Sequence, residues 1–194
     1  MRRIELPTDE ATIRSLRIGE EVLLDGVIVT ARDAAHKVLV TEKPKDLHEV
    51  LKGTAVYHCG PIVRKIGKNY KIISAGPTTS IREEPFEADV IKEYGIRGII
   101  GKGGMGKKTL EALKEYGAVY FHTVGGAAAE LARLITEVIE VRRLDLGTPE
   151  AFWVIRVKDF PCTVTMDSHC DSLHDCVEAE SKKVLDQLVS QASK

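Results

Sequence analysis

The sequence predicts an α/β fold, in which a mixed β-sheet is flanked by helices. Strand-like and helix-like segments alternate from residue 87 to about residue 138, which is typical of parallel strands connected by helices. Residues 54–58 and 70–75 also have strand composition. The glycine and asparagine between them favour a tight turn, so we expect these two segments to form an antiparallel hairpin. A mixed sheet accommodates both kinds of pairing.

The first forty residues predict a strand, a second strand and a helix. Residues 4–6 form a short apolar run that Pro7 closes, as at the edge of a sheet. Residues 21–30 are apolar and rich in β-branched side chains, which indicates a longer strand. Asp33 is expected to cap the helix that follows. His36, on that helix, is expected to be a packed or solvated side chain rather than a catalyst.

Glycine positions and apolar periodicity define the remaining elements. Gly95 and Gly117 each follow an amphipathic segment and therefore predict the ends of two helices. The predicted helices are 87–94, 107–116, 125–138 and 178–188, and the predicted strands are 96–100, 118–122 and 151–157. We expect residues 1–168 to form one domain and residues 169–194 to form a polar tail that carries the last helix.

Composition excludes several classes of protein. The chain has 28 Lys+Arg against 29 Asp+Glu, a net charge of −1, which disfavours a nucleic-acid partner. No apolar stretch approaches the roughly 18–20 residues of a membrane span, and the N-terminus lacks the apolar segment of a secretory signal. The four cysteines form no C-x-x-C pair and are too few for a disulfide scaffold. We therefore expect a cytoplasmic protein without a nucleic-acid or membrane partner.

A glycine-rich loop, residues 101–106, lies between a predicted strand and a predicted helix, where free backbone N–H groups favour an anion. Three of its glycines match the dinucleotide-binding pattern G-x-G-x-x-G, but residues 121–126 lack the acidic residue that this fold requires. A P-loop is disfavoured because Lys108 stands where magnesium binding requires serine or threonine. Lys102 instead indicates a site for a small anion. The alternative is that the glycines only permit close packing of strand and helix.

Two further segments place a cation just beyond a predicted strand. Arg32 follows one strand, and Arg82 follows another together with the hydroxyl residues Thr78 and Thr79. Taken alone, the second segment fits equally well a helix start with a surface arginine. Arginine is suited to bidentate recognition of a carboxylate. With Lys102, the two arginines therefore predict a pocket for a small dicarboxylate or hydroxy acid.

Four motifs, in their order and spacing, resemble one enzyme family. They are TARDAAH (30–36), AGPTTSIR (75–82), IGKGGM (100–105) and VGGAAAELA (124–132). The family is the beta subunit, or C-terminal domain, of class I iron–sulfur fumarate hydratases, to which the beta subunits of L-tartrate dehydratases are close relatives. The resemblance extends over residues 3–168.

The resemblance implies a hydro-lyase that converts fumarate to malate reversibly, and a fold like the swivelling β/β/α domain. It implies that the partner alpha subunit carries a 4Fe–4S cluster on three cysteines, with one iron free to bind substrate. In this chain, the residues implied to bind the substrate are Arg32, Arg82, Lys102, Thr79, Gly101 and Gly103. Thr78 matches a threonine that is proposed as the base, assisted by an aspartate of the alpha part.

The cysteines support this division between two subunits. Cluster ligands usually include some with short local spacing, whereas these cysteines stand apart at Cys59, Cys162, Cys170 and Cys176. We expect this chain to bind no cluster and no metal, and to need an alpha subunit in a hetero-oligomer. Whether the isolated chain forms a homodimer stays open.

The tail departs from the pattern expected of the family, because it contains His169, Cys170, His174 and Cys176. This spacing matches no standard zinc site, so a solvated tail is expected, with a metal ion or an intersubunit contact as the alternative. The substrate also stays open, because tartrate or another hydroxy-diacid fits the same cations. A free-standing anion-binding module is the alternative from a different class.

Overall fold

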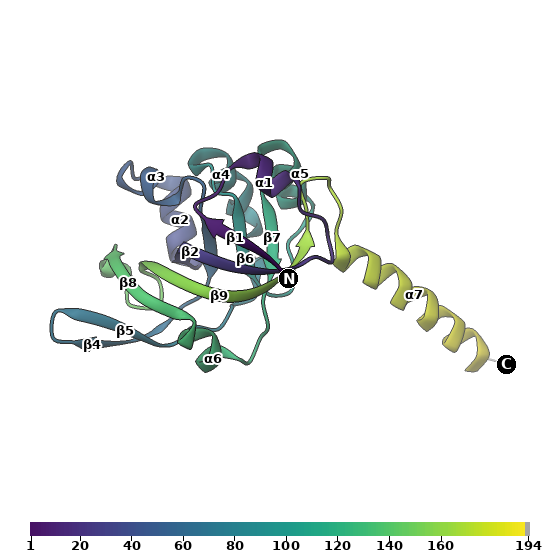
Figure 1. The fold of residues 1–194 in the computed structure, drawn as a ribbon. Coiled ribbons are helices and arrows are strands. Elements are labelled where there is room, and N and C mark those ends of the chain that lie inside the picture. Colours follow the sequence, from purple (N-terminus) through teal and green to yellow (C-terminus); the bar gives the residue numbers. More distant parts are fainter. Residues whose placement is uncertain (193–194) are drawn as a thin grey trace.

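The computed structural model describes residues 1–192, and its centre is a seven-stranded mixed sheet (Figure 1). The strand order is β1-β2-β3-β6-β7-β9-β8, with bounds β1 Arg2–Leu6, β2 Glu21–Ala31, β3 Ala55–His58, β6 Gly98–Gly101, β7 Val119–His122, β8 Ile135–Arg142 and β9 Phe152–Met166. Strands β1, β2, β3, β6 and β7 are parallel, and β9 is antiparallel to its neighbours. Because β9 pairs with both β7 and β2, the sheet curls into a partial barrel. The predicted α/β fold class is confirmed.

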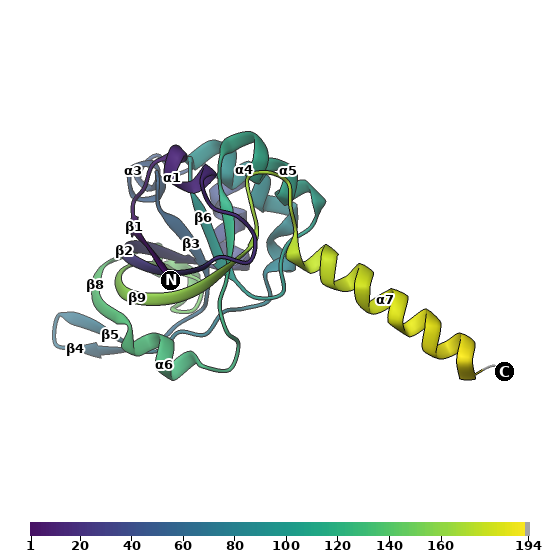
Figure 2. The ribbon, with the colours of Figure 1, turned by 45° about the vertical axis from the view of Figure 1, so that its right-hand side comes forward.

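The helices and a separate hairpin cover the curled sheet. The helices are α1 Glu10–Arg14, α2 Asp33–Thr41, α3 Asp46–Leu51, α4 Glu84–Tyr94, α5 Lys107–Tyr116, α6 Ala128–Arg133 and α7 Leu173–Ala192, with short 3-10 turns η1 Ser80–Glu83 and η2 Leu144–Leu146. Figure 1 shows α2 to α5 on one side of the sheet, and α6 with the hairpin of β4 (Ile62–Ile66) and β5 (Asn69–Ser74) on the other. Helix α1 packs Ile13 into the same hydrophobic cluster as Leu131 of α6. Helix α7 projects away from this body (Figure 2).

The sheet separates two hydrophobic clusters. Along β2, Ile28 belongs to one cluster and Val29 to the other, and along β9 Ile155 and Val154 divide in the same way. This alternation follows from the strand geometry, which points successive side chains to opposite faces. The central strands are therefore buried on both faces, and they hold the residues that follow them in fixed positions.

The predicted pairing of residues 54–58 with 70–75 is wrong. Residues 55–58 form β3, which lies in parallel between β2 and β6, and all four residues are buried. The partner of β5 is the adjacent and largely exposed strand β4, which the sequence analysis did not identify. The expected turn does occur there, with Gly67 at φ 62°. A strand buried on both faces suits the middle of a parallel sheet better than an exposed hairpin.

The predicted helix 125–138 is also too long. Helix α6 ends at Arg133, and the chain continues as β8, an edge strand paired with β9. Isoleucine, threonine and valine predominate in β8, and these β-branched side chains favour a strand over a helix. Asp33 is not the N-cap of α2. Arg32 occupies that position without a side-chain cap, and Asp33 is the first helical residue.

Several predicted boundaries are confirmed. Helix α5 has the predicted bounds, and α4 and α5 end at Gly95 and Gly117, both of which are left-handed. Strand β9 and helix α7 both extend beyond their predicted ranges, and α3 and η1 were not predicted. Among the described residues, no helix combines the length and the apolar character needed to cross a membrane.

Candidate functional site

The three predicted segments meet at one edge of the sheet. Parallel strands β2, β3 and β6 end there side by side, as the pairings of Ala31 with His58 and of Tyr57 with Ile100 show. The segment after β5 runs along the same edge, because Thr79 forms a bridge to Lys102. The carboxyl ends of parallel strands are the usual position of ligand sites in α/β sheets.

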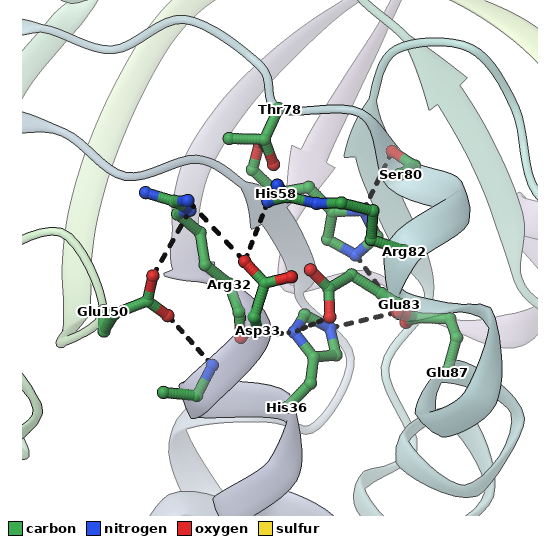
Figure 3. Close-up of polar contacts among 11 residues, drawn as sticks. Arg32, Asp33, His36, His58, Thr78, Ser80, Arg82, Glu83, Glu87 and Glu150 are labelled. Atoms are coloured by element: carbon green, nitrogen blue, oxygen red, sulfur yellow. Dashed lines mark hydrogen bonds and ion pairs between the residues drawn. The ribbon is translucent and has the colours of Figure 1, made fainter.

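Two arginines from distant segments share one carboxylate oxygen (Figure 3). A terminal nitrogen of Arg82 lies 2.8 Å from Oδ2 of Asp33, and a terminal nitrogen of Arg32 lies 3.6 Å from the same oxygen. The Nε of Arg32 is also 3.5 Å from Glu150, which in turn accepts a hydrogen bond from the backbone of Ala34. The arginine side chains are 24% and 46% exposed, so solvent reaches both. The geometry therefore suits recognition of a carboxylate.

The two threonines have different environments. Thr78 donates from its backbone N–H and from its hydroxyl to the carbonyl oxygen of His58, at 2.7 and 3.2 Å. Figure 3 shows Thr78 lying over the end of β3. Thr79 is exposed, and its bridge to Lys102 involves only the backbone. The Thr78 hydroxyl is thus held by the main chain, whereas that of Thr79 faces solvent.

Glycines bring Lys102 and its neighbours together. A Cβ on Gly101 would lie 1.9 Å from Oγ of Ser80, so only glycine allows this approach. Gly103 is left-handed, with φ 84°. The aliphatic part of Lys102 passes Gly125, where a Cβ would lie 3.4 Å from the lysine Cδ. The Lys102 side chain therefore extends from the glycine loop along Gly125.

A fully buried cluster of ionisable side chains lies behind the arginines (Figure 3). His36 of α2 and His58 of β3 each place Nε2 3.0 Å from Oε2 of Glu87 on α4, and Glu83 lies 3.5 Å from Nδ1 of His36. All four side chains are 0% exposed. His36 is therefore packed, which agrees with one of the two expectations for it.

Burial and mutual charge shift the pKa values of this cluster in different directions. Burial opposes the charged form of His36, but Glu87 and Glu83 together outweigh it and raise the pKa of His36 to about 9. For Glu87 the two histidines overcome burial and lower its pKa to about 2. Burial raises the pKa of Glu83 to about 7 and lowers that of His58. The cluster therefore favours a cation at His36 beside an anion at Glu87.

Sequence reasoning missed Glu150, His58 and Glu87 as parts of this region. His58 had a detectable signal, because it ends a strand at the same edge as Arg32 and Lys102. Glu87 had only a weak signal, since its helix was predicted but not the face that it buries. Glu150 had no detectable signal, because it lies in the loop before β9, far from Arg32 in the sequence.

Two of the four cysteines of this chain are buried in surroundings that oppose their thiolate form. Cys59 and Cys162 are buried, and burial raises the pKa of Cys59 to about 12 and that of Cys162 still further, which opposes the thiolate form that ligates iron. Cys170 is partly buried and Cys176 is exposed. Within residues 1–192, the side chains that gather closely enough to hold a metal ion are His36, His58 and Glu87, and none is a cysteine.

The start of the tail is packed rather than solvated. His169 Nε2 lies 2.8 Å from the carbonyl oxygen of Arg14, and His174 Nε2 lies 3.0 Å from the hydroxyl of Thr165. The His174 ring also covers Gly104, where a Cβ would lie 2.6 Å from it. These histidines therefore fasten the start of α7 to the body, next to the glycine loop.

Comparisons with known proteins show the family of this chain. The family described as Fumarase C-terminus matches residues 1–177. The chain is 49% identical over 186 residues to a Geobacillus stearothermophilus protein with the provisional name class I fumarate hydratase, covering 95% of this chain but 35% of the relative. It thus spans about a third of that relative's length.

Relatives of similar length bear another name. The L(+)-tartrate dehydratase subunit beta of Escherichia coli (strain K12) is 38% identical over 179 residues, which cover 92% of this chain and 87% of the relative. A Methanocaldococcus jannaschii protein, provisionally named as the same subunit, is 40% identical and covers 91% and 93%. The family match covers residues 1–177, which include the sheet edge, both arginines, the threonines and the glycine loop, and so this chain belongs to the Fumarase C-terminus family.

Proposed function

We propose that this chain is the beta subunit of a hydro-lyase that hydrates fumarate to malate reversibly, with a partner alpha subunit that carries a 4Fe–4S cluster. The observation that carries the proposal is the convergence of Arg32 and Arg82 on a single carboxylate oxygen, at the sheet edge where Lys102 also emerges. Asp33 supplies that oxygen. A substrate carboxylate would bind the same guanidinium groups in its place or beside it.

The cations match the charge that develops in such a reaction. Removal of a proton next to a carboxylate places additional negative charge on that carboxylate. Arg32, Arg82 and Lys102 lower the barrier if they bind this developing dianion more strongly than the substrate. When bound by its partner, the 4Fe–4S cluster supplies a Lewis acid for the substrate hydroxyl.

Thr78 is proposed to act beside the substrate, with help from the partner. A threonine hydroxyl is a weak base at its ordinary pKa, and here it already donates to the carbonyl oxygen of His58. That hydrogen bond leaves the oxygen lone pairs free to accept a proton. A carboxylate from the alpha subunit would supply the required basicity.

Reconstitution tests the proposal. The chain alone is expected to be inactive, and anaerobic mixing with its alpha subunit should give fumarate hydratase activity. Arg82→Ala or Lys102→Ala should lower kcat/KM by about 100-fold, in line with the loss of a charge-assisted contact to the transition state. Arg133→Ala is the matched control, since Arg133 is exposed and its ion-pair partner among residues 1–192 is Glu130 on its own helix. Strong activity without a partner would contradict the two-subunit proposal.

The second candidate substrate is tartrate. Its support is the length match, because the relatives named as tartrate dehydratase subunit beta have 87% and 93% of their own length covered by the alignment. Comparison of kcat/KM for malate and tartrate on the assembled enzyme separates the two. Calorimetry on the isolated chain addresses the third possibility, because tight dicarboxylate binding without a partner would favour a free-standing anion-binding module.

A further inference from the structure

The buried cluster behind the arginines has the donor atoms of a metal site. One ring nitrogen of His36, one of His58 and one carboxylate oxygen of Glu87 all lie within 4.8 Å of one another. Each histidine nitrogen is 3.0 Å from Oε2 of Glu87. Two nitrogen ligands and one oxygen ligand about 2.0–2.1 Å from a tetrahedral ion would lie about 3.3 Å apart, close to the 3.0 Å between each histidine nitrogen and Glu87.

Both imidazole rings are already oriented toward the centre of the cluster. The other nitrogen of His36, Nδ1, lies 3.0 Å from the carbonyl oxygen of Arg32, and that of His58 lies 2.9 Å from Oγ of Ser80. The hydroxyl of Tyr120 donates to the same Oγ. Metal-binding histidines typically use one nitrogen in this way, which fixes the ring and directs the other nitrogen to the ion.

Several polar atoms of the cluster are buried without a hydrogen-bond partner. They are Nε2 of His36, Oε1 of Glu87 and both carboxylate oxygens of Glu83. His36 Nε2 is close to Glu87, but its N–H direction does not make a hydrogen bond. Buried polar atoms are normally satisfied, and a group of unsatisfied atoms indicates an ion or a water molecule between them. A buried carboxylate is normally paired with a positive charge or coordinates a metal ion.

We propose that His36, His58 and Glu87 bind one Zn²⁺ ion, with the Glu83 carboxylate as the second negative charge beside it. Two neutral imidazoles, two carboxylates and one divalent ion are neutral together. Zinc accepts nitrogen and oxygen ligands in a tetrahedral arrangement. The ion would join α2, β3 and α4 directly beneath Arg32 and Arg82. This site is separate from the cluster expected in the partner and does not depend on the proposed reaction.

Metal analysis of the full chain tests the proposal. The chain is purified without chelator, dialysed against EDTA, and analysed for metal by mass spectrometry and for zinc release with a colorimetric chelator. Because the ligands are 0% exposed, one equivalent of zinc should survive dialysis and be released only when guanidinium unfolds the chain. Refolding with Co²⁺ should give the visible absorption of a four-coordinate ion.

Variants assign the zinc to this cluster. Glu87→Gln preserves shape and should reduce zinc to background, and His36→Ala provides a second removal of a ligand. His48→Ala is the matched control, because His48 forms a histidine–glutamate pair with Glu93 at the surface. A double Cys170→Ser, Cys176→Ser variant is a second control, which tests whether the tail cysteines bind the zinc instead. Both controls should keep one equivalent.

Two outcomes would overturn the proposal. The first is a chain that is folded by circular dichroism, contains no zinc, and gains neither zinc nor cobalt on refolding. The buried polar atoms of the cluster would then be satisfied by protons and water molecules instead of a metal ion. The second is full zinc content in a folded Glu87→Gln variant. Should Glu87→Gln and His36→Ala both fail to fold, the stoichiometry and cobalt spectrum of the unsubstituted chain still decide.

Discussion

At the scale of single residues, the candidate site depends on two positions, Asp33 and Gly101, where charge and space are used differently. Asp33 places one oxygen between two guanidinium groups, which shows that the space between Arg32 and Arg82 accepts a carboxylate. Gly101 has the opposite role, because it contributes space rather than charge. It allows Ser80 to contact both His58 and Tyr120 beneath the loop that bears Lys102.

Gly101→Ala should therefore destabilise the chain. The added Cβ would lie 1.9 Å from Oγ of Ser80 and 2.8 Å from the hydroxyl of Tyr120, in a region without free volume. Overpacking of this kind costs about 1–3 kcal/mol in the free energy of unfolding, measurable by urea denaturation. Gly125→Ala is the control, because its nearest neighbour would lie at 3.4 Å and stability should be nearly unchanged. Equal stability of both variants would refute the steric argument.

At the scale of elements, one aspartate fastens three strands together. Asp25 of β2 accepts hydrogen bonds from the backbone N–H of Asp159 at 2.6 Å and from Arg3 at 2.8 Å, and Lys158 lies 3.4 Å away. It lies where the pairing of β2 with β9 shifts register. The Asp159 hydrogen bond, with Arg3 and Lys158, lowers the pKa of Asp25 against the effect of burial. The carboxylate thus secures β1 and β9 at an irregular point of the sheet.

Asp25→Asn should lower stability in a pH-dependent way. The folded pKa of Asp25 lies below its unfolded value of about 3.9, so its contribution is present above that pH and disappears as the pH falls through the folded pKa. At pH 7 the variant should lose about 1–3 kcal/mol, typical of hydrogen bonds to a charged group. Urea denaturation from pH 7 downward should show the two chains converging in acid. A constant difference across this range would show that charge is not the cause.

Short sequence motifs predicted turns and helix ends correctly, but they did not predict which strands pair, because strand pairing depends on residues far apart in the sequence. The turn at Gly67 and the helix ends at Gly95 and Gly117 need particular backbone angles, and these positions were predicted correctly. The partner of β3 depends instead on which strand is buried on both faces of the sheet. That property arises only when β2 and β6 are in place, so composition alone gave the wrong partner.

At the scale of the whole molecule, the candidate site consists of segments that are far apart in the sequence. The order of the strands in the sheet brings these segments together. The cations Arg32, Arg82 and Lys102 were predicted because each follows a strand. The counterions of the two arginines were not predicted, since Glu150 comes from the loop before β9 and Asp33 was expected to cap its helix. Helix α7 extends away from this assembly, and Val184, Leu185 and Leu188 along it are exposed.

Helix α7 beyond its first turns should be dispensable for the fold. The side chains that fasten it, His169 and His174, lie at or before its start, and the family match ends at residue 177. A chain that ends at residue 178 should therefore unfold at nearly the same temperature as the full chain, because the removed residues bury little apolar surface. Ending the chain at residue 168 should lower that temperature by several degrees, since it uncovers Gly104 and Thr165. Differential scanning calorimetry of the three chains distinguishes the cases. A much lower unfolding temperature for the chain that ends at residue 178 would contradict this prediction. It would mean that the exposed apolar residues of α7 stabilise the chain, for example by pairing two copies, and that the domain includes the helix.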